Sequence, residues 1–118
     1  MKSELIERTK RFGINCWYFC AKVPKSREYN AFVNQLIRSS SSVGANYRAS
    51  QRAKSTADFI NKLKIVEEEA DESVFWLEIF EEVLNDNQNE IQTLMKEGKE
   101  LLAITVASIN TARKNKNK

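Results

Sequence analysis

The chain has 118 residues, of which 30% are charged and 42% apolar, with only one Pro and three Gly. So few turn-forming residues favour an all-helical fold, and the length predicts a single domain over residues 1–118. His, a P-loop, a dinucleotide-binding glycine motif and a zinc-spaced cysteine set are absent, so we expect neither an enzyme nor a metal or cofactor site. No uncharged run, residues 12–21 included, reaches the roughly 20 apolar residues of a membrane span, which predicts a cytoplasmic protein.

The first helix is predicted over residues 4–23, where apolar or small residues recur at alternating steps of three and four. This seam consists of Leu5, Thr9, Phe12, Cys16, Phe19 and Val23. Pro24 ends the helix. Cys16 and Cys20 lie four residues apart on one face, where helical geometry strains a disulfide and no further soft ligand completes a metal site. We interpret both as small buried apolar residues.

The second helix is predicted over residues 27–54, with Ser26 positioned to cap it. Its seam consists of Tyr29, Val33, Leu36, Ser40, Val43, Tyr47 and Ser50. The serines at 39–42, with Gly44, have poor helix propensity and would ordinarily indicate a loop. The alternative is a continuous helix whose small residues admit a close neighbour. Propensity alone leaves both alternatives open.

The third helix is predicted over residues 56–85, where Ser55 and Asp58 have the spacing of a capping box. The fourth is predicted over 88–113 with the same arrangement at Asn87 and Glu90, followed by a solvated basic tail at 114–118. Connections this short force successive helices to run antiparallel. The sequence therefore predicts an up-down-up-down four-helix bundle.

Helices 1 and 3 carry more apolar residues than one core uses. A bundle helix needs about three apolar positions in seven, whereas residues 59–84 hold 14 in 26. The apolar residues away from the seams are Ile14, Trp17, Tyr18, Ile65, Phe75, Trp76 and Ile79. They form either a broad stripe in a monomer or contacts between subunits, and we favour a homo-oligomer with these residues at its interface.

Charge is divided unevenly along the chain. Residues 1–56 contain 11 Lys and Arg against 3 Glu, a net charge of +8, whereas residues 57–118 carry −5. The basic candidates away from the apolar seams are Lys10, Arg11, Lys22, Arg38, Arg48 and Arg52. They form either an ordinary solvated face or a surface for the phosphates of RNA.

Residues 41–79, SSVGANYRASQRAKSTADFINKLKIVEEEADESVFWLEI, resemble the four-helix-bundle family encoded in intervening sequences of bacterial 23S ribosomal RNA genes. The residues that carry this resemblance are Gln35, Leu36, Arg38, Ser42, Val43, Ala45, Asn46, Phe59, Leu63, Glu69–Glu72, Trp76 and Leu77. The resemblance implies a left-handed antiparallel bundle that assembles as a homopentamer, with the second helix unbroken through its serines. It also implies a fold shared with the accessory protein of diversity-generating retroelements, which binds RNA and a reverse transcriptase.

Together these observations predict a non-enzymatic, homopentameric protein that binds structured RNA through a basic surface. The alternative is an interaction scaffold in which the basic helices pair with the acidic third helix and the assembly binds a protein partner.

Overall fold

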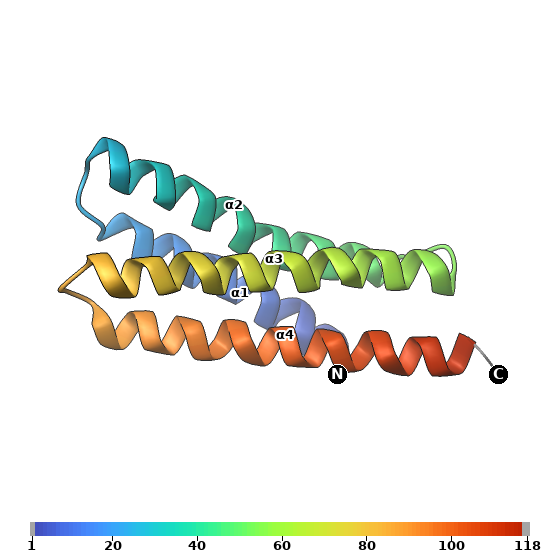
Figure 1. Cartoon of the computed structure of the whole chain (residues 1–118). Helices are drawn as coiled ribbons and strands as arrows, with labels where there is room; N and C mark the ends of the chain where they lie inside the picture. Colours follow the sequence, from blue (N-terminus) through green and yellow to red (C-terminus); the bar gives the residue numbers. More distant parts are fainter. Residues whose placement is uncertain (1, 117–118) are drawn as a thin grey trace.

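The computed structural model describes residues 2–116, and these residues form four helices joined by short connections. In chain order they are α1 (Lys2–Ala21), α2 (Arg27–Ser50), α3 (Thr56–Val83) and α4 (Gln88–Lys116). They pack into a rod of 51 × 21 × 20 Å with no strand among the described residues (Figure 1). The prediction of an all-helical four-helix bundle is confirmed.

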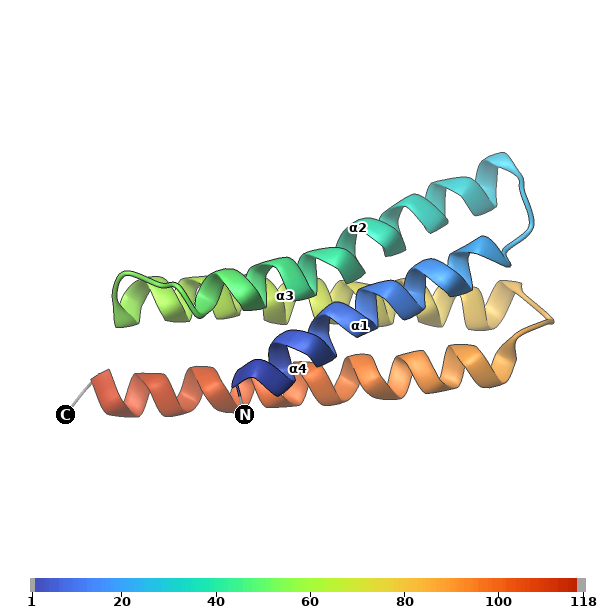
Figure 2. The ribbon, with the colours of Figure 1, turned by 180° about the vertical axis from the view of Figure 1, so that it is seen from behind.

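Each helix packs on its neighbour in the chain, and α1 also touches α4. The α1–α2 and α3–α4 connections lie at one end of the rod, and the α2–α3 connection lies at the other (Figure 1). Figure 2 shows that α1 crosses the bundle obliquely, with its N-terminal end over the middle of α4. Only α2, α3 and α4 therefore reach the end of the rod where α4 finishes.

Two serine caps start α2 and α3 at the predicted residues. The Ser26 hydroxyl accepts a hydrogen bond from the Tyr29 N–H at 3.0 Å, and the Ser55 hydroxyl accepts one from the Asp58 N–H at 3.1 Å. The Asp58 carboxylate accepts a further hydrogen bond from the Lys54 N–H at 3.0 Å. These bonds satisfy backbone donors that have no partner inside the helix.

The first helix begins at Lys2 and ends at Ala21, two residues before the predicted end. A residue that precedes proline is disfavoured in the helical conformation, and Val23 precedes Pro24. The Val23 N–H donates to the Cys20 carbonyl at 3.1 Å, three residues back. The helix therefore closes with a tight turn rather than continuing to residue 23.

The other helices also differ from the predicted bounds at their C-terminal ends. α2 ends at Ser50 instead of residue 54, because residues 51–53 form tight turns whose N–H groups donate three residues back. α3 ends at Val83 instead of residue 85, whereas α4 continues to Lys116. Residues 114–116 of the predicted tail are therefore helical, and residues 117–118 lie outside the described part of the chain.

The turn between α3 and α4 is closed differently from the predicted capping box. Asn87 has a positive φ of 61°, a conformation that Asn tolerates better than most residues with a side chain. The Gln88 side chain donates to the Leu84 carbonyl at 2.7 Å. The amide of Gln88 thus ties the start of α4 back to the end of α3.

The serines of α2 lie within an unbroken helix, as the family resemblance implies. The hydroxyl of Ser41 donates to the Ile37 carbonyl at 2.7 Å, and those of Ser39 and Ser40 donate in the same way to carbonyls three residues back. Ser39 also accepts a hydrogen bond from Ser73 of α3 at 2.9 Å between their oxygens. Because these hydroxyls are satisfied, the buried serines carry no unpaired polar group.

Small residues let α1 and α2 approach to backbone contact, as expected for this stretch. A Cβ built on Gly44 would lie 3.1 Å from the Lys10 Cα, and one on Gly13 would lie 3.1 Å from the Ser40 carbonyl oxygen. Both neighbouring atoms belong to helix backbones. The two glycines therefore set the distance between α1 and α2.

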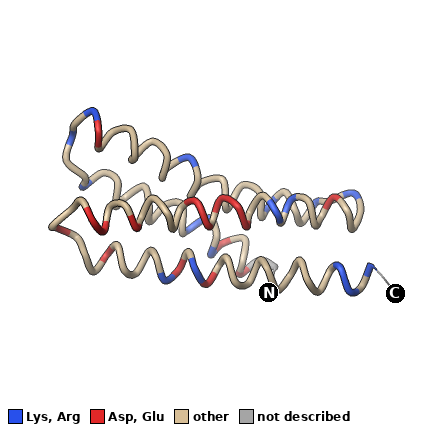
Figure 3. Tube along the Cα trace, viewed as in Figure 1, with Lys and Arg blue, Asp and Glu red and all other residues tan. Residues whose placement is uncertain are grey.

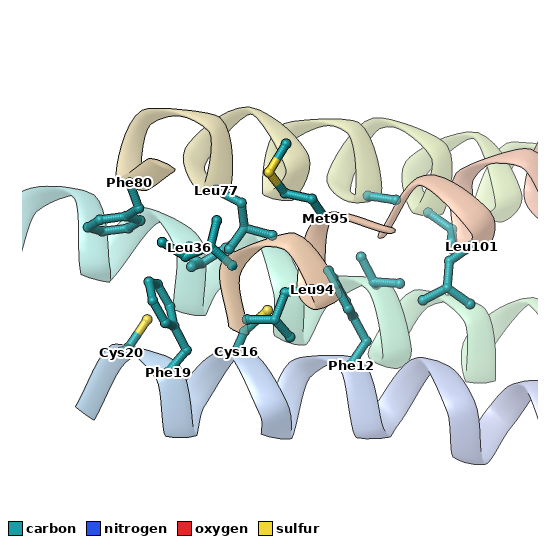
Figure 4. Close-up of a cluster of buried hydrophobic side chains, with 14 of the residues drawn as sticks. Phe12, Cys16, Phe19, Cys20, Leu36, Leu77, Phe80, Leu94, Met95 and Leu101 are labelled. Atoms are coloured by element: carbon teal, nitrogen blue, oxygen red, sulfur yellow. The ribbon is translucent and has the colours of Figure 1, made fainter. Parts of the chain in front are cut away.

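The predicted seams form the core (Figure 4). Phe19 of α1 lies beside Leu36 and Phe80, and Phe12 lies beside Leu94 of α4. The rings of Phe19 and Phe80 meet edge to face, with centroids 5.5 Å apart. Apolar burial of this kind contributes about 25 cal/mol per Å² and is the main force that holds the helices together.

Candidate nucleic-acid interface and exposed apolar surfaces

Three of the six predicted basic residues form ion pairs within the chain. Arg38 of α2 pairs with Glu72 and lies 2.9 Å from a Glu69 oxygen, and these hydrogen bonds to α3 raise the pKa of its guanidinium. Lys22 lies 3.0 Å from Glu90, and Arg11 lies 3.6 Å from Glu7. Their charges are partly neutralised by neighbouring carboxylates, which weakens them as contacts for a polyanion.

Lys10, Arg48 and Arg52 are exposed and form no ion pair with any described residue. Lys10 and Arg48 line a groove between α1 and α2, whereas Arg52 follows the end of α2. The structure therefore does not unite the six candidates on one face.

Sequence reasoning missed an ion-pair network that fastens α1 to α4. The Arg8 guanidinium reaches Glu97 at 2.7 Å and Glu100 at 2.7 Å, which raises its pKa above the usual arginine value. Its partners lie 89 and 92 residues away in sequence. No pattern within one helix could have matched them.

Basic side chains instead gather at one end of the rod. We call this surface the basic end: it consists of Arg52, Lys54, Lys64, Arg113, Lys114 and Lys116. All six are exposed, and none is in an ion pair with a described residue. Figure 3 shows Lys and Arg concentrated where α2 joins α3 and α4 finishes.

Packing of α4 against α3 explains the basic end. Arg113 and Lys116 line a depression with Ala57, Ile60 and Asn61 of α3, so the end of α4 lies beside the start of α3. Residues 101–118 contain no acidic residue, and Asp58 is the one carboxylate between residues 48 and 64. In the sequence, the signal for the basic end was the basic tail. Its place beside the start of α3 becomes known only when the four helices are folded against one another.

The predicted interface residues fall into two groups. On α1, Trp17 and Tyr18 are 55% and 56% exposed, with their rings in edge-to-face contact, and Ile14 is half-buried. On α3, Phe75 and Ile65 are 49% and 41% exposed.

The two remaining candidates on α3 are half-buried. Trp76 stacks on Phe32 of α2 with centroids 5.4 Å apart, and its ring N–H donates to Glu72 at 3.1 Å. Trp76 therefore packs within the bundle, as part of the broad stripe that was the alternative interpretation. Ile79 lies on the same helix, one turn from Phe75.

An apolar groove of about 530 Å³ lies between α1 and α2. We call it the α1–α2 groove; it is lined by Ile6, Lys10, Gly13, Ile14, Trp17, Tyr18, Ser41, Gly44, Ala45 and Arg48. The small residues Gly13, Gly44 and Ala45 leave the space between the two helices open. The exposed aromatic side chains of α1 border this groove. The lining includes two cations and no carboxylate.

Burial disfavours the thiolate form of both cysteines. Loss of hydration in the core raises the pKa of the Cys16 and Cys20 thiols to about 12. Among the described residues, no group of three His, Cys, Asp or Glu side chains is placed to hold a metal ion. The same part of the chain contains no helix with the length and apolar character that crossing a membrane requires.

We predict that a disulfide reagent reacts with native protein at least about 100-fold more slowly than with protein unfolded in urea, both near pH 8, where an ordinary thiol is partly ionised. Thiolate release measured by absorbance checks this result. Rapid labelling of either thiol in the native state would contradict it. As the pH rises, the thiols of the unfolded chain ionise near about pH 8.5, before the buried thiols of the folded chain. The contribution of the buried thiols to the free energy of unfolding is therefore constant below that pH. It is lost as the pH rises toward the pKa of the folded state.

Comparisons with known proteins agree with this four-helix architecture. The family model described as 23S rRNA-intervening sequence protein matches residues 1–107. The chain belongs to this family. A solved protein of unknown function from the S23 ribosomal protein family of Bacteroides thetaiotaomicron VPI-5482 superimposes with a TM-score of 0.83 at 26% identity, covering 93% of this chain and 99% of that one. No curated protein matches.

Membership of the 23S rRNA-intervening sequence protein family confirms the resemblance found in residues 41–79 and extends it over most of the bundle. Arg113, Lys114 and Lys116 of the basic end lie beyond the matched residues. The family match therefore gives no information about these three residues.

Proposed function

We propose that this member of the 23S rRNA-intervening sequence protein family is a non-enzymatic RNA-binding protein that acts as a homopentamer. The observation that carries the proposal is the basic end, where six exposed cations from three segments of the chain meet without a carboxylate partner among the described residues. Lys and Arg in such an arrangement contact phosphates and release the counterions bound to them. Their side chains read the backbone rather than base edges, so we expect little sequence specificity.

Assembly would increase this effect. Connections that alternate between the two ends of the rod (Figure 1) support an antiparallel up-down-up-down arrangement of each subunit. Bundles of this kind are commonly left-handed, which is the handedness we propose here. In a cyclic homopentamer whose rods lie along the ring axis, all subunits point the same way and the five basic ends would lie on one face of the ring. Each chain carries a formal charge of +3, and five chains carry about +15, enough to attract a polyanion before contact.

The test is fluorescence anisotropy of a labelled structured RNA titrated with protein from about 50 to 200 mM salt. The triple substitution Arg52→Ala, Arg113→Ala and Lys114→Ala is expected to weaken binding about 10- to 100-fold and to flatten the salt dependence. The matched control removes the same charge elsewhere, through alanine at three exposed lysines without an ion pair to a described residue: Lys25, Lys96 and Lys99. We expect the control to lose less than about threefold, because only the long-range field changes.

Equal losses in the two triple variants would show that net charge, rather than the basic end, drives binding. No binding of the wild-type protein at low salt would reject the RNA proposal altogether. A duplex DNA of equal length serves as the competitor, and we expect RNA to be preferred.

A protein-binding scaffold is the second candidate function. The observation that favours it is that Arg38, Lys22 and Arg8 form ion pairs with carboxylates of α3 and α4. Under this candidate the purified protein carries a second polypeptide and no nucleic acid. Mass spectrometry and the ultraviolet spectrum of the native complex separate it from the RNA proposal.

A further inference from the structure

A second stripe of α3 faces away from the core. We call it the α3 ridge: it consists of Ile65, Glu68, Glu72, Phe75, Ile79 and Glu82, at alternating steps of three and four. This spacing places all six along one side of the helix. Phe75 and Ile65 are the exposed apolar members, and Glu68 and Glu82 form no ion pair with a described residue. The ridge is therefore apolar with acidic neighbours.

The α1–α2 groove has the opposite charge. Its floor is apolar, and Trp17 and Tyr18 border it. Among the described residues, Lys10 and Arg48 are the charged ones that line it. From Ile6 to Tyr18 it extends about 18 Å, at 1.5 Å per helical residue. The segment from Glu68 to Ile79 extends about 17 Å on the same measure. The groove therefore accepts about three turns of the ridge.

Neither surface fits a copy of itself. Two grooves brought together would place Lys10 and Arg48 of one subunit against the same cations of the next, and two ridges would oppose Glu68 and Glu82. Like charges at a contact cost several kcal/mol and select against that pairing. The groove of one subunit and the ridge of another satisfy both the apolar and the charge requirements.

We propose that the α1–α2 groove of one subunit binds the α3 ridge of a second copy, in a contact between two different faces of the chain. This inference deepens the assembly part of the proposed function by naming the surfaces, and it does not depend on RNA binding. Contacts between different faces build closed rings when the rotation per subunit closes, whereas contacts between identical faces stop at dimers. Phe75 enters the groove beside Trp17. One of the two glutamates seven residues from Phe75, Glu68 or Glu82 according to the direction of the helix, then lies beside Lys10, which is seven residues from Trp17.

Half-interface complementation tests the proposal. The groove variant carries Lys10→Glu and Trp17→Asp, and the ridge variant carries Ile65→Asp and Phe75→Asp. All four side chains are exposed in the subunit, so both variants should retain helical circular dichroism and a cooperative urea transition. Burying an aspartate in an apolar contact costs free energy, so each altered surface should no longer bind its partner surface. The two altered surfaces should not bind each other either, because both become more acidic.

Light scattering coupled to gel filtration gives the masses. We expect the wild type to form an oligomer of the 13.6 kDa chain, each variant alone to be monomeric, and an equimolar mixture to form a one-to-one heterodimer. The heterodimer forms because only one intact groove and one intact ridge remain in each pair. A matched control, Lys25→Glu with Lys96→Glu, should assemble like the wild type.

Three results would overturn the inference: a monomeric wild type, which leaves the groove to another partner; a variant that still assembles; or a mixture that stays monomeric. The basic end is intact in both variants, so RNA binding is measured separately. Assembly without RNA binding rejects the RNA proposal alone, and RNA binding by a monomeric wild type rejects the assembly proposal alone.

Discussion

Replacing Phe80 with alanine is expected to lower the free energy of unfolding by about 3–5 kcal/mol, the usual loss for an aromatic side chain removed from a core. Phe80 is fully buried, and its ring meets Phe19 edge to face. The loss combines the apolar area returned to water with the cavity left between α1 and α3. Since domains of this size are stable by about 5–15 kcal/mol, the substitution removes a large part of the total.

Urea unfolding followed by circular dichroism measures this loss as a lower midpoint with an unchanged slope. The control is Val83→Ala, which trims an apolar side chain that is 48% exposed on the last turn of the same helix. It should change stability by less than about 0.5 kcal/mol. Similar losses in the two variants would contradict the placement of Phe80 in the core.

Replacing Gly44 with valine is expected to destabilise the protein by about 3 kcal/mol, at the upper end for an overpacked interior. A Cβ at this position would lie 3.1 Å from both the Cα and the N of Lys10, and 3.2 Å from the carbonyl carbon of Thr9. These are backbone atoms of α1, so the helix as a whole has to move to make room. The gain in helix propensity over glycine, under about 1 kcal/mol, is smaller than this cost.

Ala31→Val is the matched control, because it adds a branched side chain at an exposed position of α2 that does not line the α1–α2 groove. We expect it to cost less than about 1 kcal/mol, mostly from helix propensity. Gly98→Ala provides a second comparison. Its Cβ would lie 2.9 Å from the Val74 Cγ2 and 3.3 Å from the Phe12 Cζ, and both side chains are buried. We expect it to destabilise the protein by less than Gly44→Val, because side chains rather than a helix backbone have to move. A stable Gly44→Val protein would mean that α1 and α2 are farther apart than described.

The seams and two of the helix starts were predictable because both are local properties of the chain. Alternating steps of three and four select one face of a helix, and Ser26 and Ser55 satisfy the first free N–H groups. The helix ends were less predictable, since Pro24 acts on the residue before it. Ser39 and Ser40 lie in a helix despite their propensity, because burial against α1 and α3 outweighs a few tenths of a kcal/mol per residue.

The candidate basic surface was predicted only in part. All six candidates are exposed. Arg52 belongs to the basic end, whereas Lys10 and Arg48 line the α1–α2 groove. Arg38 was expected at the same surface but is held by Glu69 and Glu72 of α3. Which carboxylate meets which cation depends on the register between helices, and no spacing within one helix contains that information.

The sequence by itself determined the helices, the residues that face the core, the family and the uneven division of charge, because each of these follows from local periodicity or motif. Only the tertiary structure decided which charges stay free and which gather together. Close contact at Gly13 and Gly44 fixes the distance between α1 and α2, and the packing of α4 on α3 carries Arg113 to the start of α3. Long-range packing sets these distances, and Coulomb interactions between helices depend on them.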